Sequence, residues 1–164
     1  MRIRLLIVML VSPLACANTL LIPILNGDAM RQEIQETWQA CERDTWCEMA
    51  LDYHKEHYIA EANLDGATFS ITLLSSFSTH QWSQLQLHLR QDGFVLNHVT
   101  IDDQSVDIET ELALASNQAV ETKIVRLLGQ ASPESTQRLV YQHPDWRAMI
   151  VSQNGVLRVT FEPR

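Results

Sequence analysis

Residues 69–93 read FSITLLSSFSTHQWSQLQLHLRQDG, and within them the spacing of hydrophobic residues changes from every second residue to helical spacing. The first part predicts a strand with one buried face, formed by Phe69, Ile71 and Leu73. Ser78 and Gln81 then form a capping box, flanked by Phe77 and Trp82 at the positions of a hydrophobic staple. We therefore expect a helix over 79–91 that buries Trp82, Leu85 and Leu89 and stops at Gly93.

The residues that follow predict three more elements before a serine- and proline-rich loop at 131–136. A strand over 94–101 and an alternating, acidic strand over 105–114 are joined by a polar turn at 102–104. Apolar residues at helical spacing predict a helix over 117–128, which Gly129 ends.

Beyond the loop, a short strand is expected over 138–142, followed by a hairpin over 147–161. The hairpin pivots on Asn154-Gly155, a strong type I′ turn signal. With Gln153 opposite Val156, one face of this hairpin is apolar.

From residue 67 the predicted order is β-α-β-β-α-β plus a terminal hairpin, an α+β pattern. In element order alone, over about 67–142, it resembles the ferredoxin-like split βαβ fold. The resemblance implies an antiparallel sheet with two helices on one face, so 67–164 is expected to be an α+β domain.

Residues 18–66 are expected to add a helical hairpin, making 18–164 one compact unit. Its helices are predicted over 28–41 and 45–58. The pair Cys41 and Cys47 predicts a disulfide, and residues six apart on one straight helix lie too far apart for that bond. The disulfide therefore requires a break at 42–45.

The N-terminus predicts export. Arg2 and Arg4 precede an apolar run over 5–15, and Ala15-Cys16-Ala17 resembles a signal-peptidase site. Residues 1–17 are thus expected to be a cleaved signal peptide, with the working part in the periplasm or secreted. In that compartment two cysteines normally pair.

Two alternatives to simple cleavage remain. The apolar stretch continues to Leu25, long enough for an uncleaved inner-membrane anchor over 1–25. Cys16 could instead be acylated, because Leu14-Ala15-Cys16 faintly resembles a bacterial lipobox.

The chain carries a formal charge of −8, which becomes about −10 once residues 1–17 are removed. Such a charge argues against a nucleic acid or an anionic membrane surface as partner. It favours solubility or a basic partner. Membrane contact is expected only through an uncleaved N-terminus.

Three sets of residues are candidate sites. His54 and His57, three apart on the predicted helix, could share a metal ion. Asp107, Glu109 and Glu111 line one face of the predicted strand. A regular row gives the carboxylates the same environment, whereas acid–base catalysis needs two different ones. We therefore expect a solvated face or a docking surface for a basic partner. Trp146 and Arg147 could form an exposed recognition element, although Trp146 could equally begin a strand inside the core.

No catalytic, nucleotide or cofactor motif is present in the sequence, so no cofactor is predicted. The favoured function is an exported, non-enzymatic interaction module that binds another envelope or secreted protein. It could be an accessory of secretion or pilus assembly, or an inhibitor or immunity protein. The alternatives are an envelope hydrolase drawing on His54, His57 and His143, and a metal-binding protein using His54 and His57.

Overall fold

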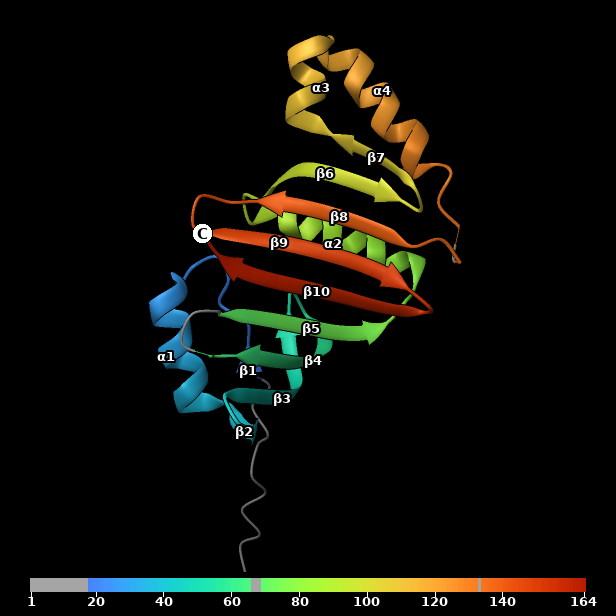
Figure 1. The fold of residues 1–164 in the computed structure, drawn as a ribbon. Helices are drawn as coiled ribbons and strands as arrows, with labels where there is room; N and C mark the ends of the chain where they lie inside the picture. The colour runs from blue at the N-terminus through green and yellow to red at the C-terminus, as the bar shows by residue number, and fades with distance from the viewer. Residues whose placement is uncertain (1–17, 66–68, 133) are drawn as a thin grey trace, which may run out of the picture.

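The computed structural model describes residues 18–65, 69–132 and 134–164. The predicted signal peptide, with Cys16, lies outside these residues. The described residues form an α+β fold with four helices and one ten-stranded sheet (Figure 1). The helices are α1 Gly27–Thr37, α2 Thr79–Gln91, α3 Ile108–Leu114 and α4 Asn117–Leu128. The strands are β1 Asn18–Thr19, β2 Gln39–Glu42, β3 Thr45–Tyr53, β4 Glu56–Asn63, β5 Ser70–Ser76, β6 Val95–Ile101, β7 Gln104–Asp107, β8 Gln137–Gln142, β9 Trp146–Gln153 and β10 Val156–Pro163.

The strand order is β1-β3-β4-β5-β10-β9-β8-β6-β7, with β2 added beside β3. Within the described part of the chain, β1 pairs with β3 in parallel and the other pairs are antiparallel. The C-terminal strand β10 therefore lies in the middle of the sheet and joins the β1–β5 half to the β6–β9 half.

The predicted strand-to-helix junction is confirmed. The Ser78 side chain accepts a hydrogen bond from the Gln81 amide at 3.1 Å, and the rings of Phe77 and Trp82 lie 6.2 Å apart. Helix α2 buries the three expected side chains, and Gly93 has a φ of +86°, which only glycine adopts without strain. The chain leaves α2 at the expected residue.

The C-terminal hairpin also has the expected register, with Gln153 opposite Val156. Asn154 and Gly155 both have positive φ, as a type I′ turn requires. The inward side chains on β10 are fully buried: Leu157, Val159 and Phe161.

The predicted helix over 45–58 is wrong, so residues 18–66 do not form a helical hairpin. Helix α1 begins within one residue of its predicted start but ends at Thr37, so the predicted helix is wrong over 39–41, which belong to β2. Strands β3 and β4 then form a hairpin. Buried residues recur at every second position on β4, at Tyr58, Ala60 and Ala62. The turn between the strands consists of His54 and Lys55, both with positive φ. These two residues lack the asparagine or glycine that marks such turns, which is why the sequence did not reveal this hairpin.

The acidic strand predicted over 105–114 is also wrong beyond residue 107. The Asp107 side chain accepts a hydrogen bond from the Thr110 amide at 2.9 Å and caps α3. Ile108 and Leu112 fit both a two-residue alternation and a helical i,i+4 spacing, and the cap selects the helix.

The ferredoxin-like arrangement does not match. In a split βαβ unit a single strand separates the two strands that the helix connects, whereas β10, β9 and β8 lie between β5 and β6. Strand β5 also lies beside β4 and β10, far from β6.

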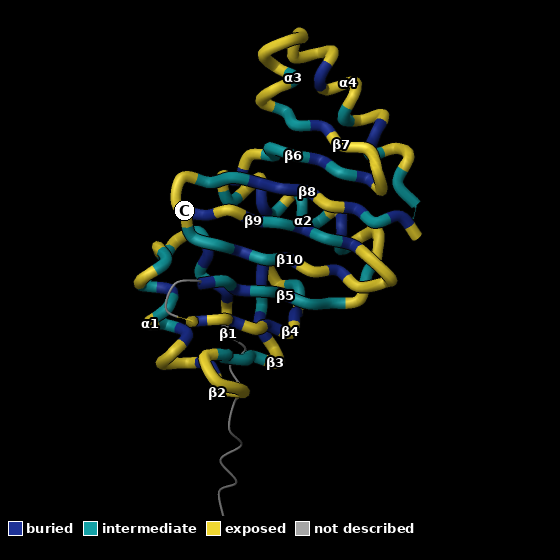
Figure 2. The backbone as a smooth tube through the Cα atoms, viewed as in Figure 1, coloured by how far each residue is buried: buried dark blue, intermediate teal, exposed yellow. Residues whose placement is uncertain are grey.

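The sheet has one covered face and one open face. Helix α2 lies behind β8–β10 in Figure 1, and no helix lies in front of these strands. The inward side chains, with those of α1 and α2, form one hydrophobic core. Helices α3 and α4 extend beyond β7, and Figure 2 shows them mostly exposed.

Residues 18–25 belong to this core region. Leu20 and Ile22 are buried, and the Leu20 amide donates to the carbonyl of Asp52. An anchor over 1–25 would have to withdraw these side chains from the core. Among the described residues, no helix is both long and apolar enough to cross a membrane.

Candidate functional site

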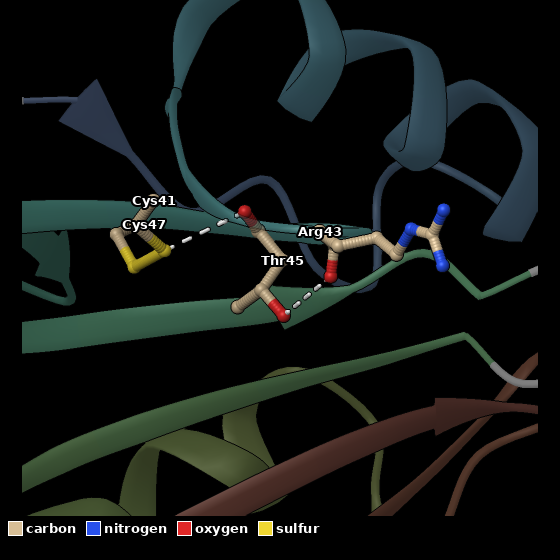
Figure 3. Close-up of a disulfide and its surroundings, with 4 residues drawn as sticks. All are labelled: Cys41, Arg43, Thr45 and Cys47. Carbon is tan, nitrogen blue, oxygen red and sulfur yellow. Dashed lines mark hydrogen bonds between the residues drawn. A yellow bond between two sulfur atoms is a disulfide. The ribbon is translucent and has the colours of Figure 1, made fainter.

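Cys41 and Cys47 are joined by a disulfide, as predicted (Figure 3). The bond ties β2 to β3, with the two Cα atoms 5.8 Å apart. The break over 42–45 that the disulfide requires is the turn between these strands, where Asp44 has a positive φ. The disulfide therefore fixes an edge hairpin.

His54 and His57 do not share a helix face. His54 lies in the β3–β4 turn, where its Nε2 is 2.9 Å from both carboxylate oxygens of Asp92. His57 lies on β4, and its Nδ1 contacts the carboxylate of Asp52. The two rings thus pair with different carboxylates. No group of three metal-ligating side chains occurs among the described residues.

The His54 contact belongs to a larger cluster at the C-terminal end of α2. The Tyr53 hydroxyl donates a 2.6 Å hydrogen bond to Asp92, and the His54 ring stacks on His88 of α2. Tyr53 also meets Phe161 of β10 edge-on, with ring centroids 5.9 Å apart. We call Tyr53, His54, His88 and Asp92 the histidine cluster; it fastens the β3–β4 turn to α2.

Burial perturbs the acid–base groups of this cluster. Burial lowers the pKa of His88 below 6.5, and the neighbouring His54 lowers it further. Burial and the hydrogen bond to Asp92 raise the pKa of Tyr53. The Nδ1 atom of His88 has no hydrogen-bond partner within the described ranges. A neutral His88 is therefore favoured in the folded protein.

His143 lies apart from His57 and serves the turn before β9. Its Nδ1 accepts a hydrogen bond from the Asp145 amide at 3.3 Å, and its ring lies 5.2 Å from that of Phe94. Each of the three histidines considered for a hydrolase thus has its own local partners.

The three predicted carboxylates do not form a row. Asp107 caps α3 and lies 3.5 Å from His98, while Glu111 pairs with Lys123 of α4 at 2.6 Å. The cap hydrogen bond from Thr110 lowers the pKa of Asp107. An acidic strand face that could dock a basic partner is therefore absent from this segment.

Trp146 and Arg147 point to opposite faces of β9. Trp146 is fully buried, and its Nε1 donates to the carbonyl of Leu25 at 2.9 Å, so it is a core residue. Arg147 lies on the open face, 3.6 Å from Glu162, and its side chain is 44% exposed. Only the arginine can contribute to an interaction surface.

The open face gathers three arginines from neighbouring strands. Arg138, Arg147 and Arg158 lie on β8, β9 and β10, and all three are exposed. Within the described residues, no hydrogen bond or ion pair engages the side chain of Arg138 or Arg158. We call these arginines, with the outward residues Val140, Met149 and Val151 between them, the arginine face.

A hollow opens on this face beside β6. It is lined by Asn97, His98, Thr100, Asp107, Arg138, Val140, Gln142 and Arg147. Its lining includes two arginines and two side-chain amides, which can donate hydrogen bonds to a carboxylate, together with the carboxylate of Asp107. Asn97 lies where the β6–β8 register shifts, a bulge that redirects its side chain.

The sequence identified Arg147 as a candidate interaction residue but did not identify Arg138 and Arg158. The expected hairpin register already placed Arg158 on the face opposite Leu157 and Val159. The sequence did not predict that β8 pairs with β9, and this pairing brings Arg138 opposite Val151 and so onto the same face.

Comparison of the chain with protein-family models, with curated proteins and with solved structures finds no match.

Proposed function

We propose that this chain is an exported, non-enzymatic interaction module of a bacterial envelope, and that it binds its partner protein on the arginine face. The observation that carries the proposal is the open side of β8–β10, which no helix covers in Figure 1 and which presents three arginines. In a chain of net charge −8, such a gathering of positive charge is unexpected for a merely solvated surface.

The composition of the arginine face supports binding of a protein. Met149 and Val151 are half-buried and lie between the arginines, so the face combines apolar area with exposed cations. Arginine and methionine are enriched in protein interfaces. The disulfide supports the proposed location in the periplasm or outside the cell.

The histidine cluster gives little support to the alternative function, an envelope hydrolase, because its side chains already bind one another. Asp92 already accepts from Tyr53 and contacts His54, and Tyr53 is held protonated by burial. These contacts suit a structural junction between the β3–β4 turn and α2.

The proposal is tested by placing a photo-crosslinking amino acid at Met149 in cells that express the full chain. We expect one envelope or secreted protein to be crosslinked, and we expect the crosslink to disappear when Arg138, Arg147 and Arg158 are all replaced by glutamine. The same crosslinker at Val125, exposed on α4, provides the control for chance encounters.

A matched control removes positive charge elsewhere. Arg43→Gln and Arg126→Gln change the net charge without touching the arginine face, and they should leave the crosslink intact. A Met149 crosslink that survives the triple replacement would overturn the proposal.

A further inference from the structure

The three arginines have a fixed spacing that follows from the strand register. Arg138 and Arg158 both lie opposite Val151, one on each side of β9. They are therefore level with each other and about 10 Å apart, two strand spacings. Arg147 lies four residues from Val151 along β9, a distance of about 13 Å at the usual rise per residue.

The surface between these arginines is apolar. Val140 is 5% exposed and lines the hollow, and Met149 lies opposite it on β9. A segment lying along the strands from Arg138 to Arg147 would therefore place its central side chain on Met149, beside the almost fully buried Val140. Its charged side chains would meet guanidinium groups at both ends.

The arginines are available to such a segment. Arg138 has no partner within the described ranges. Arg147 is paired with Glu162 at 3.6 Å, but both side chains are nearly half exposed. A solvated ion pair of this kind contributes little and exchanges readily for a carboxylate held bidentately.

We infer that the arginine face recognises an extended acidic segment of a partner protein, with two carboxylates four residues apart and apolar side chains between them. The inference rests on the proposed function and specifies the partner's chemistry. An extended chain advances about 13 Å over four residues, which matches the separation of Arg138 and Arg147 along the strand direction. Alternate residues of an extended chain point to one side, so both carboxylates and the residue midway would face the sheet.

The test uses the purified protein and a fluorescein-labelled peptide with two glutamates four residues apart and valine between them. Fluorescence anisotropy should show binding that weakens as salt is raised, because the charges are exposed. Arg138→Gln and Arg147→Gln should each weaken it on the order of tenfold. Because both arginines are exposed, neither replacement should alter folding, which circular dichroism and thermal unfolding will check.

Two controls decide the outcome. A peptide with glutamine for both glutamates should not bind detectably, and Arg43→Gln should bind the glutamate peptide as the unmodified protein does. Equal binding of both peptides, or binding that ignores Arg138 and Arg147, would overturn the inference.

Failure of the inference can be separated from failure of the proposed function. If the Met149 crosslink depends on the arginines but the glutamate peptide does not bind, the acidic segment is wrong and the interaction face stands. If neither depends on the arginines, both fail. Binding of the protein to vesicles of anionic lipid through Arg138 and Arg147, without binding of the peptide, would also overturn the acidic segment.

Discussion

The imidazole of His54 stacks on that of His88, with ring centroids 4.3 Å apart and planes 10° from parallel. One ring belongs to the β3–β4 turn and the other to α2, so this stack joins two parts of the chain more than thirty residues apart. Because two imidazolium ions would repel each other at this distance, the stack favours a low charge.

Stability should depend on the protonation of His88. The groups around it are His54, Asp92, Glu56 and Tyr53. Burial lowers the pKa of His88, so the unfolded chain takes up the proton first as the pH falls through 6.5. The stabilisation is therefore complete above pH 6.5 and is lost as the pH falls through the folded pKa.

Urea unfolding at a series of pH values between about 7 and 5 measures this effect. His88→Gln should flatten the decline in the free energy of unfolding, whereas His80→Gln, an exposed histidine on the same helix, should leave it unchanged. Equal slopes for the unmodified protein and His88→Gln would show that His88 does not contribute.

The hydrogen bond from Tyr53 to Asp92 should stabilise the same junction. Tyr53→Phe keeps the buried ring against Phe161 and removes only the donor to a carboxylate. We expect a loss of about 2 kcal/mol in the free energy of unfolding, as is typical for hydrogen bonds to charged groups. Tyr141→Phe is the matched control, since Tyr141 is also a buried tyrosine and its hydroxyl makes no hydrogen bond within the described residues. Equal losses in the two variants would assign the effect to packing.

The two β-hairpins show where sequence reasoning succeeded and failed. Asn154-Gly155 and His54-Lys55 both form two-residue turns with positive φ. Asparagine and glycine adopt this conformation readily, so the first turn was predictable from local preference. His54 and Lys55 adopt it because β3 and β4 pair around them and the His54 ring is held by Asp92, a residue 38 positions away. That contact is tertiary and leaves no local signal.

The arginine face could be predicted only in part, because its arrangement also depends on tertiary contacts. Alternation along each strand assigns Arg147 and Arg158 to outward positions. Their arrangement also requires the strand order, in which β9 lies between β8 and β10. Hairpin connections predict the β9–β10 neighbour. The turn at 143–145 was expected from its proline and aspartate, but these residues do not show that the strands on either side of it pair with each other.

The disulfide should act locally. Replacement of Cys41 and Cys47 by serine removes a short loop constraint, and we expect a loss of up to about 2 kcal/mol. Because every residue of β2 is exposed, amide hydrogen exchange should accelerate over 39–47 and stay unchanged in β9. Reduction of the unmodified protein should reproduce the change and should have no effect on the double serine variant. Acceleration spread over the whole sheet would contradict a local role.

Asp107 should control whether α3 forms. Its pKa is lowered from 3.8, chiefly by the hydrogen bond from the Thr110 amide, so the cap is favoured above that pH and is lost as the pH falls through the folded pKa. NMR chemical shifts of Ile108–Leu114 should therefore move toward coil values at acidic pH.

Two variants at this position separate the cap from the charge. Asp107→Ala should leave α3 frayed at every pH, whereas Asp107→Asn, which still accepts the amide hydrogen bond but does not titrate, should keep it formed at acidic pH. A helix that persists in the alanine variant would show that contacts with α4 and β6 suffice.

Trp146 should hold the N-terminal segment on the core. Its Nε1 donates to the carbonyl of Leu25, and its buried ring lies edge-on to Phe69. Trp146→Phe keeps an aromatic ring but leaves the carbonyl without this donor, so we expect a loss of about 2 kcal/mol in urea unfolding. Limited proteolysis should then cut within 18–26 sooner than in the unmodified protein. Trp82→Phe is the control, because Trp82 is also buried and its side chain makes no hydrogen bond in the part of the chain that the structure describes. If Trp82→Phe exposes 18–26 equally, loss of ring volume explains the effect, and the hydrogen bond to Leu25 does not.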